Sequence, residues 1–475
     1  MNFNSFDFGL FLVIVFGLYW SLGKTVRTQN IILVLASYIF YAFWDVRFLA
    51  LIIFSTLIDY FVGIKLYNAK KNRRVILSIS LICNLGMLFF FKYYNFFIES
   101  FSNTISFFGV DLSLRHMDII LPVGISFYTF QTLSYSIDIY RNKIQPTKDI
   151  IAFAAYVCFF PQLVAGPIER AQRFLPQFFR KKVFNYAHAV NGLRQFLWGL
   201  FKKIVIADNC AAYVNAVYSD FQNYDSGTLI IAAIGFSIQI YCDFSGYSDM
   251  AIGMARFFGF DLMKNFNYPY FSRDIAEFWR RWHISLSTWF RGYVYIPLGG
   301  SRGDTQEVLK NIFVVFIISG LWHGANWTFI CWGGVHALLY VPLFLFKKNR
   351  NHLDTVSFIG VWPSIKNGIK ILSTFTLVTF SWIFFRSDTI KVAFAYISNM
   401  FSFSLHNKSL SVDYLLVTII VGFFVIEWMG RKQEYAIEKL FLNNSRLLRY
   451  SFYLTVCILL FVFNGKKQEF IYFQF

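Results

Sequence analysis

Long apolar runs separated by short polar connections make up most of the chain. A helix needs about 20 apolar residues to cross a bilayer, and several of these runs are long enough for two passes or for a bent helix. We therefore predict an all-α polytopic membrane protein with about 11–13 transmembrane or re-entrant helices. The runs lie near residues 6–22, 30–44, 48–66, 75–96, 118–138, 149–168, 190–215, 227–258, 310–346, 367–386, 412–430 and 448–465.

We interpret the chain as one integral-membrane domain over residues 1–475. It has N-terminal spans at 1–100, a central core at 118–346 that holds the candidate chemistry, and C-terminal spans at 367–475. No internal repeat of the kind common in secondary transporters is visible in the sequence, which weakens a carrier interpretation. The first residues lack a basic segment and a small-residue cleavage motif, so we expect the first run to be a retained span.

One segment differs from both the spans and the loops. Between Phe271 and Trp289, aromatic and aliphatic residues recur at helical spacing, and charged residues occupy the opposite face. We predict one amphipathic helix that lies in the membrane interface or covers a cavity between spans. His283 falls at the border of its two faces.

Composition and charge support a membrane location. Of all residues, 57% are hydrophobic and 15% are charged, against about 25% charged in soluble domains. The net charge of +18 could indicate nucleic-acid binding, but the basic residues gather in short connections between apolar runs. We therefore expect no nucleic acid as a partner and attribute the clusters to cytoplasmic loops, which favour Lys and Arg. Connections poor in Lys and Arg alternate with connections rich in them, and this alternation predicts an external N-terminus and a cytoplasmic loop at 65–74.

Standard soluble-enzyme motifs are absent from the sequence, including a P-loop, a zinc-protease helix and a complete nucleophile elbow. The cysteines are isolated and have no histidine at metal-ligand spacing, so we expect neither a disulfide framework nor a metal site. Candidate chemistry therefore rests on polar residues inside apolar sequence. Each such residue costs about 2.5–3.5 kcal/mol on insertion and tends to mark a site or a pathway.

His323 is the strongest candidate, because Gly320 and Gly324 flank it and let a ligand or another backbone approach closely. Its imidazole could accept a proton from an attacking hydroxyl or thiol near neutral pH. The alternative is a buried histidine that only hydrogen-bonds a neighbouring helix. His283 is the natural second member, although it could instead reach water beside two arginines. His336 would face away from His323 on one continuous helix and is a weaker candidate.

Two acids, Asp243 and Asp249, lie in an apolar run and need buried partners, which Arg256 or the arginines of 271–289 could supply. We prefer a structural ion-pair or hydrogen-bond network to a direct catalytic role for them. Asp59 is expected to hydrogen-bond between helices. The prolines and glycines of FFPQLVAGPIER (159–170) suggest a bent or re-entrant element, and the arginines of this region could receive an anionic cofactor or cap a helix.

Six ordered blocks resemble the membrane-bound O-acyltransferase family, and within it the bacterial branch of alginate O-acetylation. A more distant similarity is to the D-alanyl transfer protein of teichoic acid modification. The resemblance runs through most of the chain. The blocks are LPVGISFYTFQTLSYSIDIYR (121–141), FFPQLVAGPIER (159–170), YCDFSGYSDMAIG (241–253), FWRRWHISLSTWFRGYVYIPLGG (278–300), GLWHGANWTFICWG (320–333) and FIYFQF (470–475).

The resemblance implies a ring of bent helices around a central tunnel, with the active histidine midway across the membrane. His323 falls at the principal catalytic histidine of the family. His283 falls at its second active-site position, which is His, Asn or Asp in different branches. The tunnel-lining candidates are Asn326, Trp322, Trp282, Asp243, Ser245 and Tyr247, and the candidates for binding the acyl donor are Arg170, Arg173, Arg280 and Arg281.

The implied activity is the transfer of an acyl group, expected to be acetyl, from a cytoplasmic thioester across the membrane for O-acetylation of an extracytoplasmic polysaccharide. The donor would be acetyl-CoA or another acyl thioester, with no bound cofactor. The expected partners are membrane lipid and an extracytoplasmic acetyltransferase, and the expected location is the bacterial cytoplasmic (inner) membrane. The alternatives are peptidoglycan O-acetylation, D-alanyl transfer to teichoic acid and, outside enzymes, a transporter or flippase for a surface-polymer precursor.

Overall fold

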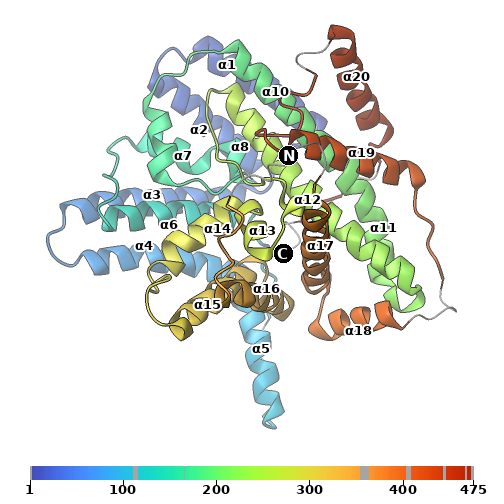
Figure 1. Cartoon of the computed structure of the whole chain (residues 1–475). Helices are drawn as coiled ribbons and strands as arrows, with labels where there is room; N and C mark the ends of the chain where they lie inside the picture. Colours follow the sequence, from blue (N-terminus) through green and yellow to red (C-terminus); the bar gives the residue numbers. More distant parts are fainter. Residues whose placement is uncertain are drawn as a thin grey trace. The chain divides into compact units, whose positions relative to one another are not determined.

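The computed structural model describes residues 3–110, 116–164, 166–353, 363–402, 408–441, 445–465 and 468–471. In this part of the chain the regular elements are helices joined by turns and loops (Figure 1). The chain divides into two compact units. The first comprises Met1–Gly192 and Met254–Met263, and the second comprises Leu193–Gly253 and Lys264–Phe475. The interpretation of residues 1–475 as one domain stays a prediction.

In the first unit, α3 packs against α4 and α6, and α2 packs against α7. Helix starts follow local chemistry, because Ser5, Thr25 and Asp45 each accept a hydrogen bond from a backbone N–H of the first turn. The unit contains α1 (Phe6–Leu22), α2 (Val26–Ala42), α3 (Val46–Asn68), α4 (Arg73–Leu88), the π-helix η1 (Phe89–Tyr93), α5 (Tyr94–Phe107), α6 (Ile125–Tyr140), α7 (Ile150–Cys158), α8 (Phe160–Leu163), α9 (Ala171–Phe174), the 3-10 helix η2 (Leu175–Phe179) and the first part of α10 (Tyr186–Leu200).

In the second unit, α16 packs against α15, α13 and α17. The unit contains the remainder of α10, the π-helix η3 (Phe201–Ala207), α11 (Asp208–Ser219), the 3-10 helix η4 (Phe221–Asn223), most of α12 (Ser226–Phe257), the 3-10 helix η5 (Pro269–Phe271), α13 (Ile275–Arg281), α14 (Ile284–Phe290), the π-helix η6 (Arg291–Tyr295), α15 (Thr305–His323), α16 (Trp327–Leu345), α17 (Ile365–Arg386), α18 (Ile390–Phe401), α19 (Tyr414–Gly430) and α20 (Arg446–Val462).

The apolar helices confirm the prediction of an all-α, multi-pass membrane protein. Shorter apolar helices add to the spans and account for part of the higher count expected from the sequence. The central tunnel stays a prediction. Among the described residues, six helical stretches are long and apolar enough to cross a membrane, namely Val46–Asn68, Arg73–Phe107, Ser226–Phe257, Thr305–His323, Trp327–Leu345 and Ile365–Arg386, and the shorter ones are Phe6–Leu22, Ile150–Leu163, Ile390–Phe401 and Tyr414–Gly430.

The prediction of one continuous amphipathic helix from Phe271 to Trp289 is wrong. The segment forms the short helices α13 and α14, which are separated at Trp282 and His283. His283 has φ 43° and ψ 55°, a left-handed conformation that ends a right-handed helix. The periodicity of the side chains persists across the break, which is why the sequence pattern did not reveal it.

Helix α18 is absent from the predicted spans. It is short and amphipathic, with Ala393 and Tyr396 buried and Phe394 exposed. A search for apolar runs of bilayer length does not detect this helix, because it has 12 residues and a span needs about 20.

Asp59 is the centre of a polar network inside the first unit, as the sequence predicts. Its carboxylate accepts hydrogen bonds from Ser80 Oγ (2.5 Å) and Asn84 Nδ2 (2.7 Å) on α4, and from Ser136 Oγ (2.5 Å) on α6. All four side chains are fully buried. The network therefore joins three apolar helices through side-chain hydrogen bonds, and the predicted role of Asp59 as an inter-helix hydrogen-bonding residue is confirmed.

Candidate active site

His323 and His283 lie close together in the second unit. His323 is the last residue of α15, and His283 lies between α13 and α14. The centroids of the two imidazole rings are 6.0 Å apart. Both residues are buried, with 2% and 0% of their surface exposed. Two imidazoles at this distance, shielded from water, form a centre that can handle protons on a small group placed between them.

Aromatic rings surround the two imidazoles. The ring centroid of Phe244 lies 4.6 Å from that of His283, and Trp322 lies 5.8 Å away. The rings of Trp332 and Phe385 lie 5.1 Å and 5.6 Å from that of His323. A site walled by aromatic rings excludes water and lowers the local dielectric constant. Charge that develops there interacts more strongly with neighbouring groups than it would in water.

The glycines beside His323 serve close helix packing. A Cβ atom at Gly320 would lie 2.2 Å from the carbonyl oxygen of Phe329, and one at Gly324 would lie 2.1 Å from the Phe329 ring. Of the two uses that the sequence allowed for these glycines, the structure shows the approach of another backbone. Helix α16 can therefore lie directly against the end of α15 that carries His323.

The remaining aromatic and amide candidates occupy different places. Trp282 is fully buried, with its ring 5.1 Å from that of Trp382, and Trp322 contacts both histidine rings. Asn326 caps α16: its Oδ1 accepts a hydrogen bond from Thr328 N, and its Nδ2 donates to the carbonyl oxygen of Asp388. The two tryptophans therefore lie in or beside the histidine centre, whereas the contacts of Asn326 are those of a helix cap.

Asp243 and Asp249 have lysine partners, so the expectation of arginine partners is wrong. Lys203 Nζ lies 2.8 Å from Asp243 Oδ1, and Lys202 Nζ lies 2.5 Å from Asp249 Oδ2. Lys202 also donates to Ser245 Oγ at 2.9 Å. Both lysines belong to η3, whose π-helical geometry is often found at functional sites. The available signal in the sequence was the position of both lysines inside the apolar run 190–215.

Tyr247 lies beside the end of the chain. Its ring centroid is 4.2 Å from that of Phe470, and Phe470 also contacts Phe244 at 5.9 Å. The backbone N–H of Ile471 donates to Asp243 Oδ2 at 2.8 Å. The first two residues of the terminal block FIYFQF are therefore buried against α12, and residues 472–475 lie outside the described residues.

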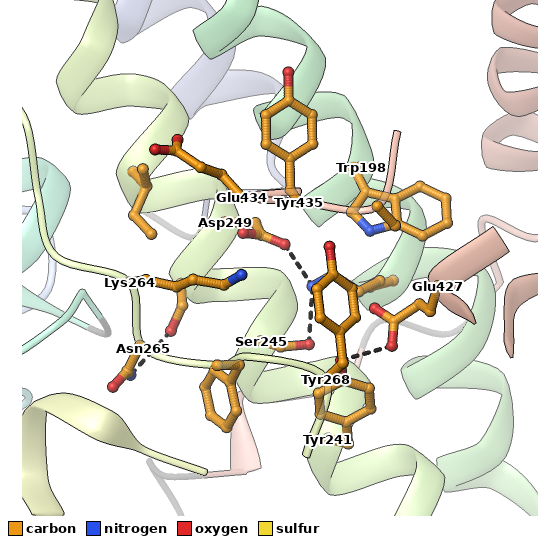
Figure 2. Close-up of a pocket in the computed structure, with 15 residues that line it drawn as sticks. Trp198, Tyr241, Ser245, Asp249, Lys264, Asn265, Tyr268, Glu427, Glu434 and Tyr435 are labelled. Carbon is orange, nitrogen blue, oxygen red and sulfur yellow. Dashed lines mark hydrogen bonds and ion pairs between the residues drawn. The ribbon is translucent and has the colours of Figure 1, made fainter. Parts of the chain in front are cut away.

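A small polar pocket is lined in part by Lys202, Ser245 and Asp249 (Figure 2). Its volume of about 20 Å³ has room for about one water molecule. Lys264 lines it and donates to Asn267 Oδ1 (2.9 Å) and to the carbonyl oxygen of Gln433 (3.2 Å). Burial lowers the pKa of Lys264 to about 8. The pocket also contains Asn265 and Phe266, and the ring of Phe266 stacks on that of His283 at 6.5 Å.

The arginine candidates for donor binding are engaged with the protein itself. In the second unit, Arg281 is buried and its Nη2 lies 2.7 Å from Glu277 Oε1, while Arg280 donates to two backbone carbonyl oxygens. In the first unit, Arg170 precedes α9, and Arg173 Nη1 lies 2.7 Å from a carboxylate oxygen of Glu169. The role of these arginines in donor binding stays a prediction.

Glu169 is a buried acid beside the half-exposed Arg173. Burial raises the pKa of Glu169 to about 7, and the charge of Arg173 opposes this shift. Glu169 also accepts a hydrogen bond from the backbone N–H of Met263. Its contacts are those of an acid that joins two segments of the first unit.

His336 is held by hydrogen bonds on both ring nitrogens. Trp279 Nε1 donates to its Nδ1 at 3.2 Å, so Nδ1 carries no proton and the ring is neutral with its proton on Nε2. The Nε2–H then donates to Ser381 Oγ at 3.0 Å, and Ser381 donates to the carbonyl oxygen of Val378 at 2.7 Å. His336 is thus a structural residue that joins α13, α16 and α17.

Sequence reasoning missed Asn265, which is fully buried next to His283 in the second unit. It belongs to the segment NFNYPYF (265–271), whose Asn and Pro residues are typical of a loop. The available signal was its place between a long span and the segment that carries His283. Because loop residues can be polar for many reasons, that signal was not specific.

Comparison with known proteins agrees with the resemblance seen in the sequence. The model of the membrane-bound O-acyltransferase family matches residues 141–386, a stretch that contains both His283 and His323. A protein named probable alginate O-acetylase AlgI from Pseudomonas aeruginosa is 39% identical over 441 residues, which cover 91% of this chain and 81% of the relative.

Two further relatives extend this comparison. The protein of the same name from Azotobacter vinelandii is 38% identical over 442 residues, covering 91% of this chain and 85% of its own. The peptidoglycan O-acetyltransferase of Helicobacter pylori is 37% identical over 397 residues, covering 78% of this chain and 73% of its own. With this extent of similarity, the chain belongs to the membrane-bound O-acyltransferase family and is an acyltransferase.

Proposed function

We propose that this protein transfers an acetyl group from a cytoplasmic thioester, acetyl-CoA or another acyl thioester, across the membrane for O-acetylation of an extracytoplasmic polysaccharide. One observation carries the proposal: two buried histidines, with ring centroids 6.0 Å apart, lie within the region that matches the family model. The names of the relatives favour alginate or a similar exopolysaccharide as the final acceptor, with peptidoglycan as the next candidate.

His323 acts as the general base. Its imidazole takes the proton from the acceptor hydroxyl while the hydroxyl oxygen attacks the carbonyl carbon of the thioester. A carbon–oxygen bond forms, the carbon–sulfur bond breaks, and the departing sulfur takes the proton back from the imidazolium to leave as a thiol. The base ends in the state in which it began, so the step needs no further reactant.

His283 orients the reacting group. A hydroxyl between two rings whose centroids are 6.0 Å apart can be within hydrogen-bond reach of both imidazoles. The aromatic wall formed by Phe244, Trp332 and Phe385 keeps water, a competing nucleophile, away from the thioester. The site therefore favours transfer over hydrolysis.

The same proposal covers the location of the protein, the approach of the donor and the partner. The protein lies in the bacterial inner membrane with its N-terminus outside, and the donor approaches from the cytoplasm with Arg170 and Arg173 as binding candidates. No bound cofactor takes part. An extracytoplasmic acetyltransferase partner completes the transfer to the polymer.

The test uses a strain that lacks this protein, complemented with wild type or His323→Ala at equal membrane levels. NMR of the purified surface polysaccharide should show O-acetyl groups with wild type and none with the variant. Undiminished acetylation with His323→Ala would remove the proposal. NMR of separated exopolysaccharide, peptidoglycan and teichoic acid fractions identifies the acceptor, and D-alanyl esters in place of acetyl esters would favour the alternative of D-alanyl transfer.

A further inference from the structure

His283 has a backbone conformation that needs support. Trp282 N donates to the carbonyl oxygen of Phe278 at 2.8 Å and so completes α13, and the chain then turns into the left-handed region at His283. An L-residue in this region costs about 1–2 kcal/mol. Such strained conformations persist where the surrounding structure fixes them, and they gather at functional sites. His283 therefore depends on contacts that fix the chain on either side of it.

Asn265 binds both residues that follow His283. Its backbone carbonyl oxygen accepts a hydrogen bond from Ile284 N at 2.9 Å. Its side-chain Oδ1 accepts hydrogen bonds from Ser285 Oγ at 2.9 Å and from Ser285 N at 3.3 Å. Asn265 thus fixes the first turn of α14 directly after the strained residue.

Asn265 is itself anchored. Its Nδ2 donates to Ser248 Oγ on α12 at 3.2 Å, at the edge of the small polar pocket (Figure 2). Two residues further on, Asn267 N donates to the carbonyl oxygen of Arg281 at 2.9 Å, on the other side of the break. The segment 264–268 therefore contacts the chain both before and after His283, and Asn265 ties it to α12.

We propose that Asn265 is a positioning residue that holds His283 in the left-handed conformation and so keeps its imidazole beside that of His323. The inference rests on the proposed function, in which His283 takes part in the transfer. An amide suits the position because it accepts hydrogen bonds from Ser285 and donates one to Ser248 at the same time. A leucine at 265 would fill the space and remove all three side-chain hydrogen bonds.

The first experiment measures the accessibility of His283 directly. Purified Asn265→Leu is treated with diethyl pyrocarbonate, and modification of His283 is followed by peptide mass spectrometry. The matched control is Asn267→Leu, because Asn267 lies on the same segment but its Oδ1 accepts from Lys264. We expect modification of His283 to accelerate by at least about tenfold in Asn265→Leu, a loss of about 1.4 kcal/mol of protection, and to stay at the wild-type rate in the control.

The second experiment measures acetyl transfer. In Asn265→Leu we expect kcat to fall by about 100-fold, as for a misplacement of about 1 Å, while KM for the thioester stays near that of wild type. Adding Asn265→Leu to His283→Ala should cause little further loss of kcat, because both changes act on one group. If the fold-losses of kcat in the two single variants multiply in the double variant, Asn265 has a general structural role and the inference is overturned.

The remaining outcomes are also decisive. Unchanged modification of His283 in Asn265→Leu overturns the inference. If the leucine variant does not accumulate, Asn265→Ala keeps the backbone carbonyl bond to Ile284 and should give a smaller acceleration, and an unchanged rate there overturns the inference as well. Full activity of His283→Ala would remove both the role of His283 and this inference, whereas the His323→Ala test of acetylation would be unaffected.

Discussion

Two regions of the molecule bury polar side chains among apolar helices, and they do so in different ways. In the first unit, Asp59 on α3 accepts three side-chain hydrogen bonds from residues of the α-helices α4 and α6. In the second unit, His283 and His323 lie among aromatic rings, and the backbone at His283 is left-handed. Both arrangements remove polar groups from water, and contacts within the protein have to replace the lost hydration.

The difference between the two regions indicates which buried polar residues carry chemistry. A buried group whose hydrogen bonds are completed by neighbouring helices stabilises the fold and has little capacity left for a substrate. The histidine centre combines ionisable rings, an aromatic wall and a strained backbone, three features that together favour a functional site. Burial of a polar residue in a span is therefore not enough to identify a site.

The largest expected effect is the loss of transfer rate in His323→Asn, and the same substitution at the buried His336 is its control. His323→Asn should lower the rate of acetyl transfer by about 10²- to 10⁴-fold, the usual contribution of a general base, and leave the Tm nearly unchanged. His336→Asn should lower the Tm, because its hydrogen bonds join α13, α16 and α17, and should leave transfer per folded molecule close to wild type. Kinetic assays and thermal unfolding in detergent measure both quantities. Equal losses of transfer rate in His323→Asn and His336→Asn would contradict the distinction between a catalytic and a structural histidine.

Substitution of Asp59 should lower the stability of the protein and leave the transfer rate unchanged, the opposite of His323→Asn. Asp59→Ala leaves buried donors on Ser80, Asn84 and Ser136 without their acceptor, and we expect a loss of about 3 kcal/mol in the free energy of unfolding. The transfer rate per folded molecule should not change. Asp59→Asn, which keeps one oxygen as an acceptor, is the matched control and should lose less stability. A fall in turnover of the folded Asp59→Ala protein would contradict a purely structural role.

The last prediction concerns Lys264, the first residue of the segment 264–268 that supports His283, and it appears as a change of stability with pH. Burial lowers its pKa from 10.5 to about 8 in the folded protein. Between these two values the unfolded chain binds the proton more tightly, so stability rises with pH from about 8 to about 10.5 and is lowest below this range. The gain of wild type relative to Lys264→Met should approach about 3 kcal/mol. Thermal unfolding across this pH range measures it, and a constant difference would show that the lysine has an ordinary pKa.

The sequence predicted the fold class and most helix positions, because apolar runs at bilayer length are the strongest signal that a chain can carry. The run at 6–22 coincides with α1, and the run at 310–346 divides into α15 and α16 at the turn after His323. Helix α18 was missed because it is shorter than a span. The break at His283 was missed because the information lies in contacts with other segments rather than in the local pattern.

The candidate site was predictable in part. The pair of histidines followed from the sequence and from the resemblance to the family, and the structure brings the two rings together. The partners of Asp243 and Asp249 did not follow, because the sequence gives no measure of which cation reaches which acid across the fold. Asn265 was also missed, since its importance depends on hydrogen bonds to residues that are distant in sequence, such as Ser285.

The most direct test of the account follows the acyl group through the two-histidine centre. Purified protein in lipid vesicles is given acetyl-CoA carrying a labelled acetyl group, together with the extracytoplasmic acetyltransferase partner and an oligosaccharide acceptor, and both released thiol and labelled ester are measured. Wild type should release one thiol for each ester formed, and the double variant His283→Ala, His323→Ala should give neither product while keeping the Tm of wild type. Equal amounts of ester from wild type and the folded double variant would contradict the account.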